Sequence, residues 1–326
     1  MSAGPSVDAA VRVGSSRGGT ARAGPPPVVA VVGPTAAGKS AVAREVAARV
    51  DAEIVAVDAF TIYRGMDIGT ATPSAADRAA VPHHLVDELE PEQDCSAQWF
   101  QARARQAIAG VHERGRCALL VGGSGLYFRA VVDPLEFPPT DAAVRAAVAE
   151  RHPDAAAAHA ALRRADPDAA TRMDPGNHRR ALRALEVLEL TGRRFSDWRR
   201  CWERFDSVYP RLTVVGLDLP REALWARIAA RVDDMLAAGF VDEAAALHGR
   251  RLSRTAAAAI GYRELWAHLD GEQSLDEARE RIIVRTRRYA ARQQRWFARD
   301  PRVRWMDADS AIEVAATAGA RDHRRR

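Results

Sequence analysis

A short apolar run that ends in a glycine-rich turn constrains the fold of this chain more than any other feature. Residues 27–32 read PVVAVV, and residues 33–40 read GPTAAGKS, which matches the phosphate-loop pattern G-x-x-x-x-G-K-[ST]. The next residues place Val42, Val46 and Val50 at helical spacing. A buried strand, a phosphate loop and a helix in this order predict an α/β fold of the P-loop NTPase type.

Further apolar runs extend the predicted sheet. Residues 53–57, 117–121 and 211–219 are typical of additional buried strands, and residues 97–115 show the spacing of a helix between two of them. Strands that alternate with helices favour right-handed crossover connections. The sequence therefore predicts a parallel sheet flanked by helices.

Five segments of different character divide the chain. Residues 1–26 are rich in Gly, Ser, Pro and Arg, which predicts a disordered N-terminal extension. Residues 27–133 and 211–310 contain the strand patterns and are expected to form the P-loop α/β core. Residues 134–210 hold several helical patterns and no strand pattern, so we expect an all-helical insertion domain. Residues 311–326 are interpreted as a basic C-terminal tail.

Composition excludes several classes of protein. Cys95, Cys117 and Cys201 are far apart in the sequence, so neither a disulfide framework nor a zinc module is indicated. A reducing cytoplasm suits such a chain. No run of about eighteen apolar residues is present, so we expect no membrane span. We expect a monomer without an obligate protein partner.

The net charge of +5 favours phosphate-rich partners but does not establish nucleic-acid binding.

The phosphate loop has a defined chemistry. Its glycines allow backbone N–H groups and the start of the following helix to face a phosphate. Lys39 is expected to neutralise phosphate charge, and the Ser40 hydroxyl is placed to bind Mg²⁺. Such a loop can hold a nucleotide or another phosphorylated molecule, and the motif does not decide between them.

Asp58 ends the predicted strand 53–57, at the sheet edge where α/β proteins bind ligands. The residues alone leave three interpretations of this carboxylate equally open. It can hold Mg²⁺, act as a general base towards a substrate beside the phosphates, or cap the segment that follows.

Eight ordered stretches resemble those of bacterial tRNA dimethylallyltransferases, also called isopentenyl-pyrophosphate:tRNA transferases, and the similarity extends from about Val28 to Asp307. The stretches are GPTAAGKS, VDAFTIYRGMDIGTATPS, VPHHLVD, LLVGGSGLYFRAVV, FPPTDAAVR, RRALRALEVLELTGR, AIGYREL and TRRYAARQQRWFARDPRVRW. YRGMDIGTA together with GGSGLY is far more specific than the phosphate loop alone.

This resemblance implies a reaction. Dimethylallyl diphosphate would lie in the phosphate loop, and N6 of the adenosine at tRNA position 37, beside the anticodon, would attack the allylic carbon with loss of diphosphate. The resemblance gives Asp58 the role of general base and places Thr35 near the bridging oxygen of the diphosphate. Arg227 and Arg231, four residues apart, are expected to clamp the diphosphate, although without the resemblance their spacing favours a solvated surface pair. The implied diphosphate-binding residues are Gly33, Pro34, Thr35, Ala36, Ala37, Gly38, Lys39, Ser40, Arg227 and Arg231.

The resemblance also implies contacts with the tRNA anticodon stem-loop, some of them from the helical insertion. The expected residues are Asp58, Ala59, Phe60, Thr61, Ser124, Arg145, Arg179, Arg180, Ala181, Leu182, Arg183, Gly261, Tyr262, Arg263, Arg287, Arg288 and Arg292. The last three belong to a helix that a capping box at Ser274 and Glu277 opens, and that is predicted to run to about Phe297. Its acids lie in the first two turns and its arginines mostly beyond them, which suits a phosphate backbone, although a solvated face is the alternative.

The sequence departs from the family in one short stretch of interest. The family commonly has Asp-Ser-Met-Gln after the second strand, whereas this chain has Asp58, Ala59, Phe60 and Thr61. The loss of the Gln bears on how the target RNA loop is recognised more than on the diphosphate site.

Other functions fit parts of the sequence. An adenylate isopentenyltransferase, which prenylates free AMP, ADP or ATP, shares the loop and the following Asp, but it needs neither the helical insertion nor the arginine-rich helix. A P-loop kinase would turn over ATP, and an RNA-binding protein without catalysis would bind tRNA and transfer nothing.

Overall fold

The computed structural model describes residues 25–198 and 200–320. All but the last two residues of the predicted N-terminal extension, 1–26, lie outside the described residues, as do residues 321–326 of the predicted tail. Within residues 25–198 and 200–320, no helix is both long enough and apolar enough to cross a lipid bilayer.

Six parallel strands form one sheet in the order β3-β2-β4-β1-β5-β6. The predicted α/β fold with a parallel sheet is confirmed. The four predicted strands are β1, β2, β4 and β5, and the two edge strands β3 and β6 were not predicted as strands. The bounds are β1 (Val28–Val32), β2 (Ala52–Ala56), β3 (His83–His84), β4 (Cys117–Gly122), β5 (Leu212–Leu217) and β6 (Val303–Met306).

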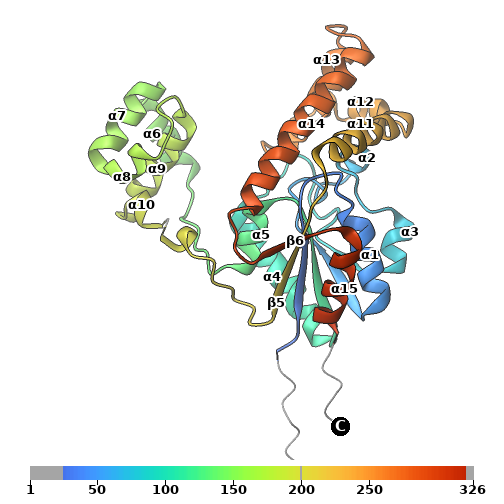
Figure 1. Cartoon of the computed structure of the whole chain (residues 1–326). Coiled ribbons are helices and arrows are strands. Elements are labelled where there is room, and N and C mark those ends of the chain that lie inside the picture. The colour runs from blue at the N-terminus through green and yellow to red at the C-terminus, as the bar shows by residue number, and fades with distance from the viewer. Residues whose placement is uncertain (1–24, 199, 321–326) are drawn as a thin grey trace, which may run out of the picture.

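Helices cover both faces of the sheet (Figure 1). All five residues of β1 are buried, because alternate side chains pack into two different cores. On one face Val29 and Val31 pack against α1 (Lys39–Arg49) and α15 (Ala308–Gly319). The other face packs against α4 (Ala97–Glu113) and α5 (Gly125–Val132). The sheet is therefore the middle layer of three.

The prediction that residues 311–326 form a tail is wrong for the part that the structure describes. Asp307 accepts a hydrogen bond from the Ser310 N–H and so starts α15. Ala311 and Ala315, four residues apart, are fully buried against the sheet. Their spacing marks the inward face of a helix, and it outweighs the basic character of the last residues.

A second group of helices lies beyond the carboxyl ends of the strands (Figure 1). The predicted capping box at Ser274 and Glu277 is confirmed as the start of the long helix that reaches Phe297. The group consists of α2 (Asp67–Thr70), α11 (Arg221–Ala237), α12 (Phe240–Leu247), η2 (Ala256–Ala258), α13 (Tyr262–Leu269) and α14 (Leu275–Phe297), with α3 (Ala75–Ala80) nearer to α1. These roofing helices cover the sheet edge at which the phosphate loop lies.

The remaining helices form a separate arm that stands beside the core (Figure 1). They have a core of their own, with Val148, Leu162 and Leu185 among its buried residues. Extended segments on either side of the arm connect it to α5 and β5. The arm contains α6 (Ala142–Arg151), α7 (Ala155–Ala165), α8 (Pro167–Thr171), α9 (His178–Thr191), α10 (Phe195–Trp198) and η1 (Arg200–Glu203).

Hydrogen bonds and ion pairs fix the base of this arm. The Arg129 guanidinium pairs with the buried Asp133 carboxylate and donates to the carbonyl oxygens of Trp202 and Arg204. Arg302 pairs with Asp133 from the other side, at 2.6 Å. Both segments that enter the arm are thus held to α5 and to the segment before β6.

A buried carboxylate stabilises the sheet away from the edge at which the phosphate loop lies. Glu53 in β2 is 2% exposed and pairs with Arg114, Arg116 and His84. The hydrogen bonds from Arg114 lower the pKa of Glu53 to about 2, with further lowering by His84 and Arg116 that outweighs the effect of burial. His84 therefore has a structural partner in Glu53.

We predict that Glu53→Gln lowers the free energy of unfolding by roughly 3 kcal/mol, because three partners lose a buried charge. The folded-state pKa lies below the unfolded one, so the contribution is complete above 4.5 and is lost as pH falls towards about 2. In denaturant titrations the difference between wild type and variant should therefore stay constant from about pH 7 to about pH 5 and shrink between about pH 5 and about pH 2. The matched control is Glu45→Gln, since Glu45 pairs with Arg49 at the surface. Equal effects of the two substitutions would contradict this assignment.

Candidate active site

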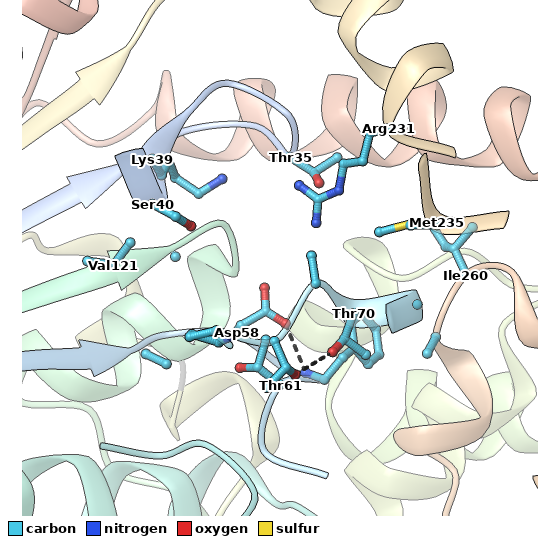
Figure 2. Close-up of a pocket in the computed structure, with 18 of the residues that line it drawn as sticks. Thr35, Lys39, Ser40, Asp58, Thr61, Thr70, Val121, Arg231, Met235 and Ile260 are labelled. Carbon is cyan, nitrogen blue, oxygen red and sulfur yellow. Dashed lines mark hydrogen bonds between the residues drawn. The ribbon is translucent and has the colours of Figure 1, made fainter. Parts of the chain in front are cut away.

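A cavity of about 350 Å³ lies where the carboxyl ends of β2, β4 and β1 meet the roofing helices. Figure 2 shows its polar side chains converging from several elements. The phosphate loop supplies Thr35, Lys39 and Ser40, while Asp58 follows β2 and Arg231 comes from α11. The structure thus brings together the residues predicted for diphosphate binding and for proton removal.

The phosphate loop owes its shape to positive backbone angles. Gly33 has φ 140° and Gly38, immediately before α1, has φ 98°. Gly33 also packs tightly, since an added Cβ would lie 3.3 Å from the Leu217 carbonyl oxygen. Gly38 directs the first N–H groups of α1 towards the cavity, where they form the positive end of the helix.

Lys39 is the only lysine in the sequence, and its ammonium group donates a hydrogen bond to the Pro34 carbonyl oxygen at 2.7 Å. Lys39 is half-buried and lines the cavity, and protein surrounds its ammonium group. This desolvation, together with the nearby Arg231 charge, lowers the pKa of Lys39 to about 8, and Asp58 only partly offsets it. An anion in the loop would restore the charged form.

Arg231 and Arg227 extend from α11 towards the loop from two sides. The guanidinium of Arg231 points into the cavity (Figure 2). Burial lowers the pKa of Arg231, with Asp58 opposing. Among the described residues, Arg231 has no hydrogen-bond or ion-pair partner. Arg227 lies on the outer side, 3.4 Å from the Ala37 carbonyl oxygen. The helical spacing of the two arginines therefore places them around the loop, as the clamp requires.

Asp58 is held by the backbone that follows it. Its Oδ1 accepts the Phe60 N–H at 2.9 Å, so one of its two carboxylate oxygens caps the segment that follows. Gly122 in β4 lets this chain segment come close, because an added Cβ would lie 1.9 Å from the Val57 carbonyl oxygen. The other carboxylate oxygen remains available to a ligand in the cavity, so the two catalytic interpretations stay open.

The departure at residues 59–61 changes the floor of the cavity. Thr61 is 8% exposed, and its Oγ1 is buried without a hydrogen-bond partner among the described residues. Phe60 is half-buried and lines both this cavity and a neighbouring one. The Thr61 hydroxyl therefore replaces the longer Gln side chain of the family pattern, and the Phe60 ring stands where that pattern has Met.

Sequence reasoning did not identify the contribution of α14 to the cavity. This helix shows two stripes, each of which lines a different cavity. Ile282, Thr286, Tyr289 and Gln293 line the first cavity, and Arg285, Arg288 and Arg292 line a second cavity of about 350 Å³ beside it. The spacing of the uncharged residues within an arginine-rich helix was the available signal for an inward face.

The second cavity shares Phe60, Ile260 and Tyr289 with the first. Arg288 and Arg292 are exposed beside it, as expected for RNA contacts. Arg287 is half-buried, with its guanidinium 5.2 Å from the centre of the Trp225 ring. Two of the three predicted arginines of α14 are thus at the surface, and the third packs against α11.

Two residues predicted to bind RNA are instead core residues. Tyr262 is fully buried and donates its hydroxyl to Glu243, and Ala181 is buried in the core of the arm. Their side chains offer no surface to RNA, so this part of the prediction is wrong. Gly261 is also buried, where an added Cβ would meet the Phe240 ring at 2.5 Å, whereas its neighbour Arg263 is exposed.

The arm presents a mixed set of the predicted residues. Arg179 and Arg180 are exposed at the start of α9, and Leu182 is half-buried. Arg145 and Arg183 both pair with the buried Glu186, at 3.0 Å in each case. These two arginines therefore neutralise an internal carboxylate. Arg145 is nevertheless exposed, as Arg179 and Arg180 are, whereas Arg183 is half-buried. Ser124, outside the arm, follows β4 and is half-buried.

A metal ion at this site would depend on few protein ligands. The described residues contain no group of three or more His, Cys, Asp or Glu side chains able to hold a metal. Ser40 lines the cavity beside Lys39. Mg²⁺ commonly takes one or two protein oxygens and completes its shell with phosphate oxygens and water, so this donor set fits Mg²⁺ on a phosphate ligand.

Comparisons with known proteins agree with this geometry. The family model described as IPP transferase matches residues 61–300. A tRNA dimethylallyltransferase of Nocardioides sp. is 50% identical over 301 residues, which cover 89% of this chain and 96% of the relative. The family-model match includes the arm and most of the helices around the cavity but begins after the phosphate loop and Asp58.

Solved structures show the same arrangement. The full-length tRNA isopentenylpyrophosphate transferase from Bacillus halodurans superposes with a TM-score of 0.65 at 38% identity, covering 89% of this chain and 94% of that one. A eukaryotic dimethylallyltransferase acting on tRNA superposes with a TM-score of 0.76 at 24% identity, covering 87% and 74%. At that identity the second comparison supports the fold alone.

We predict that Lys39 titrates near pH 8 in the free protein and at higher pH when inorganic diphosphate is bound. Because the chain has a single lysine, ¹³C at Cε of lysine gives one side-chain resonance to follow by NMR. Above about pH 8 the affinity for diphosphate should fall, since the free site loses its ammonium proton. Lys39→Arg serves as the control that removes the resonance. A midpoint near 10.5 with and without diphosphate would contradict the prediction.

Proposed function

The chain belongs to the IPP transferase family, and on that premise we propose that it transfers a dimethylallyl group from dimethylallyl diphosphate to tRNA. The acceptor atom is N6 of the adenosine at position 37, and diphosphate is released. One observation carries the proposal: a single cavity is lined by Lys39 and Ser40 of the phosphate loop, by the carboxylate of Asp58, and by Arg231, which has no partner among the described residues. A leaving diphosphate and an attacking amine need these groups on opposite sides of the allylic carbon.

The cationic side of the cavity suits the leaving group. The bond between the allylic carbon and the diphosphate oxygen breaks as negative charge grows on that oxygen. Lys39, Arg231 and the N–H groups at the start of α1 stabilise that charge, because they are already oriented and partly desolvated. Thr35, whose side chain lies in the cavity between these groups, is within the same loop (Figure 2).

Asp58 suits the attacking group. The N6 amine of adenine is a weak nucleophile, and it loses one proton as its new bond to carbon forms. The carboxylate oxygen of Asp58 that does not bind Phe60 accepts this proton. The Phe60 N–H fixes the orientation of the carboxylate, so the acceptor oxygen is directed before the substrate arrives.

The cavity also has an apolar wall that suits a five-carbon allylic group. Figure 2 shows two of its members, Met235 of α11 and Ile260. An apolar wall excludes water from a carbon centre that becomes positively charged during the reaction. The residues are Ile228, Val232, Met235, Phe240, Ile260 and Ile282.

Mg²⁺ is the cofactor we propose, with the Ser40 hydroxyl as its protein ligand beside Lys39. When bound, the ion supplies additional positive charge for the departing diphosphate.

The RNA is proposed to reach the site from the second cavity. Arg288 and Arg292 lie there beside Phe60 and Tyr289, which also line the first cavity. A base extruded from the anticodon loop can stack on an aromatic ring while nearby arginines hold the flanking phosphates. Arg179 and Arg180 on the arm offer a second basic surface for the same RNA. The cytoplasm, where Cys95 and Cys117 would stay reduced thiols, is the proposed location.

We predict that Asp58→Asn lowers the rate of prenyl transfer to tRNA by about 100-fold or more, because the base is lost. The amide oxygen of Asn can still accept the Phe60 N–H, so the loop and diphosphate binding should remain. Radiolabelled dimethylallyl diphosphate and an unmodified tRNA with adenosines at positions 36 and 37 give the assay. Asp218→Asn is the matched control, since Asp218 follows β5, is exposed, and does not line the cavity. Wild-type protein that transfers nothing would disprove the proposed function.

The acceptor distinguishes this proposal from its alternatives. We predict that equimolar unmodified tRNA and AMP yield labelled tRNA almost exclusively, because the basic surfaces beside the cavity recognise a polyanion. Preferential labelling of AMP would instead identify an adenylate isopentenyltransferase. Phosphate transfer from ATP, without prenyl transfer, would identify a kinase.

A further inference from the structure

The side-chain amide of Gln293 bridges the phosphate loop and the turn that follows β4. Its Oε1 accepts the Thr35 N–H at 2.8 Å, and its Nε2 donates to the Gly123 carbonyl oxygen at 3.0 Å. Gln293 is 5% exposed. Both polar atoms of its side chain thus have backbone partners in a place that is almost closed to solvent. Thr35 and Gln293 are 258 residues apart in the sequence.

The site is shaped around this amide. An added Cβ on Gly123 would lie 2.2 Å from the Gln293 Nε2, so position 123 has room for the amide only because it is glycine. Two residues further on, an added Cβ on Gly125 would lie 1.9 Å from the Trp296 ring of the same helix. The turn after β4 is thus fitted to the end of α14 at two positions.

The bridge determines which groups of the loop face the ligand. Because the Thr35 N–H points to Gln293, it is not among the donors that meet a phosphate. The Thr35 side chain is left inside the cavity, and the N–H groups at the start of α1 remain for the anion. The Thr35 N–H is therefore an exception among the loop N–H groups that are expected to face a phosphate.

We propose that Gln293 is a positioning residue that holds the phosphate loop in the shape that binds diphosphate. Gln293 does so from α14, the helix that also carries the RNA-facing arginines. The inference rests on the proposed function, since it takes diphosphate as the ligand of the loop. Gln293 touches neither reacting atom. It acts by fixing the Thr35 peptide against β4, while Arg288 and Arg292 on neighbouring turns of α14 face the second cavity.

The decisive comparison is between Gln293→Leu and Gln294→Leu. Gln294 is the matched control because it has the same side chain on the next position of α14 and lines neither cavity. Calorimetric titration with inorganic diphosphate and Mg²⁺ should show affinity reduced about tenfold or more for Gln293→Leu, as expected when two buried backbone groups lose their partner. Affinity for unmodified tRNA should stay within about twofold of wild type for both variants.

A pH profile separates positioning from a general effect on folding. In Gln293→Glu a carboxylate can accept the Thr35 N–H but cannot donate to Gly123, and it adds negative charge beside the loop. Diphosphate affinity relative to wild type should be low at neutral pH and should recover as the pH falls and the acid gains a proton to donate. If Gln293→Leu does not fold, the pH profile of Gln293→Glu alone decides whether Gln293 positions the loop.

Several results would overturn the inference. They are unchanged diphosphate affinity in Gln293→Leu, equal losses of diphosphate and tRNA affinity in that variant, and a Gln293→Glu profile parallel to that of wild type. If wild type binds diphosphate but transfers no prenyl group, the proposed function fails while the role of Gln293 in the loop is still tested by the same titrations.

Discussion

The cavity holds more positive than negative charge, and the rest of the structure depends on that imbalance. Lys39 and Arg231 face it with Asp58 as the nearest carboxylate, and desolvation disfavours both cations. Partly buried like charges are costly unless a ligand of opposite charge completes the site. A diphosphate supplies that charge, and its departure as a more negative product strengthens the interaction during the reaction. The same feature therefore explains binding and catalysis.

The fold places these groups by backbone contacts more than by charge pairing. Strand order puts β4 between β1 and β2, so the phosphate loop and Asp58 face each other across the end of β4. Gly122 and Gly123 leave room there for the Val57 carbonyl and for the Gln293 amide. The roofing helices add Arg231 and the apolar wall. The arm is fixed to the core by Arg129, and its exposed arginines lie outside this arrangement.

Much of the core could be predicted because its signals are local. The apolar run 28–32, the phosphate loop and the capping box at Ser274 each specify structure within a few residues. The edge strands were not predicted because two or four residues carry little periodicity. The C-terminal helix was mistaken for a tail because its basic end outweighed the spacing of Ala311 and Ala315. The contact of Gln293 with Thr35 is long-range, and no local pattern announces it.

Nucleoside mass spectrometry of tRNA tests the central claim most directly. Cells that lack the gene should contain no isopentenyladenosine or its derivatives in tRNA. Wild-type protein should restore the modification, and Arg231→Gln should fail to do so while remaining folded, because the cavity loses one of its cations. An unchanged nucleoside profile in cells without the gene would contradict the account.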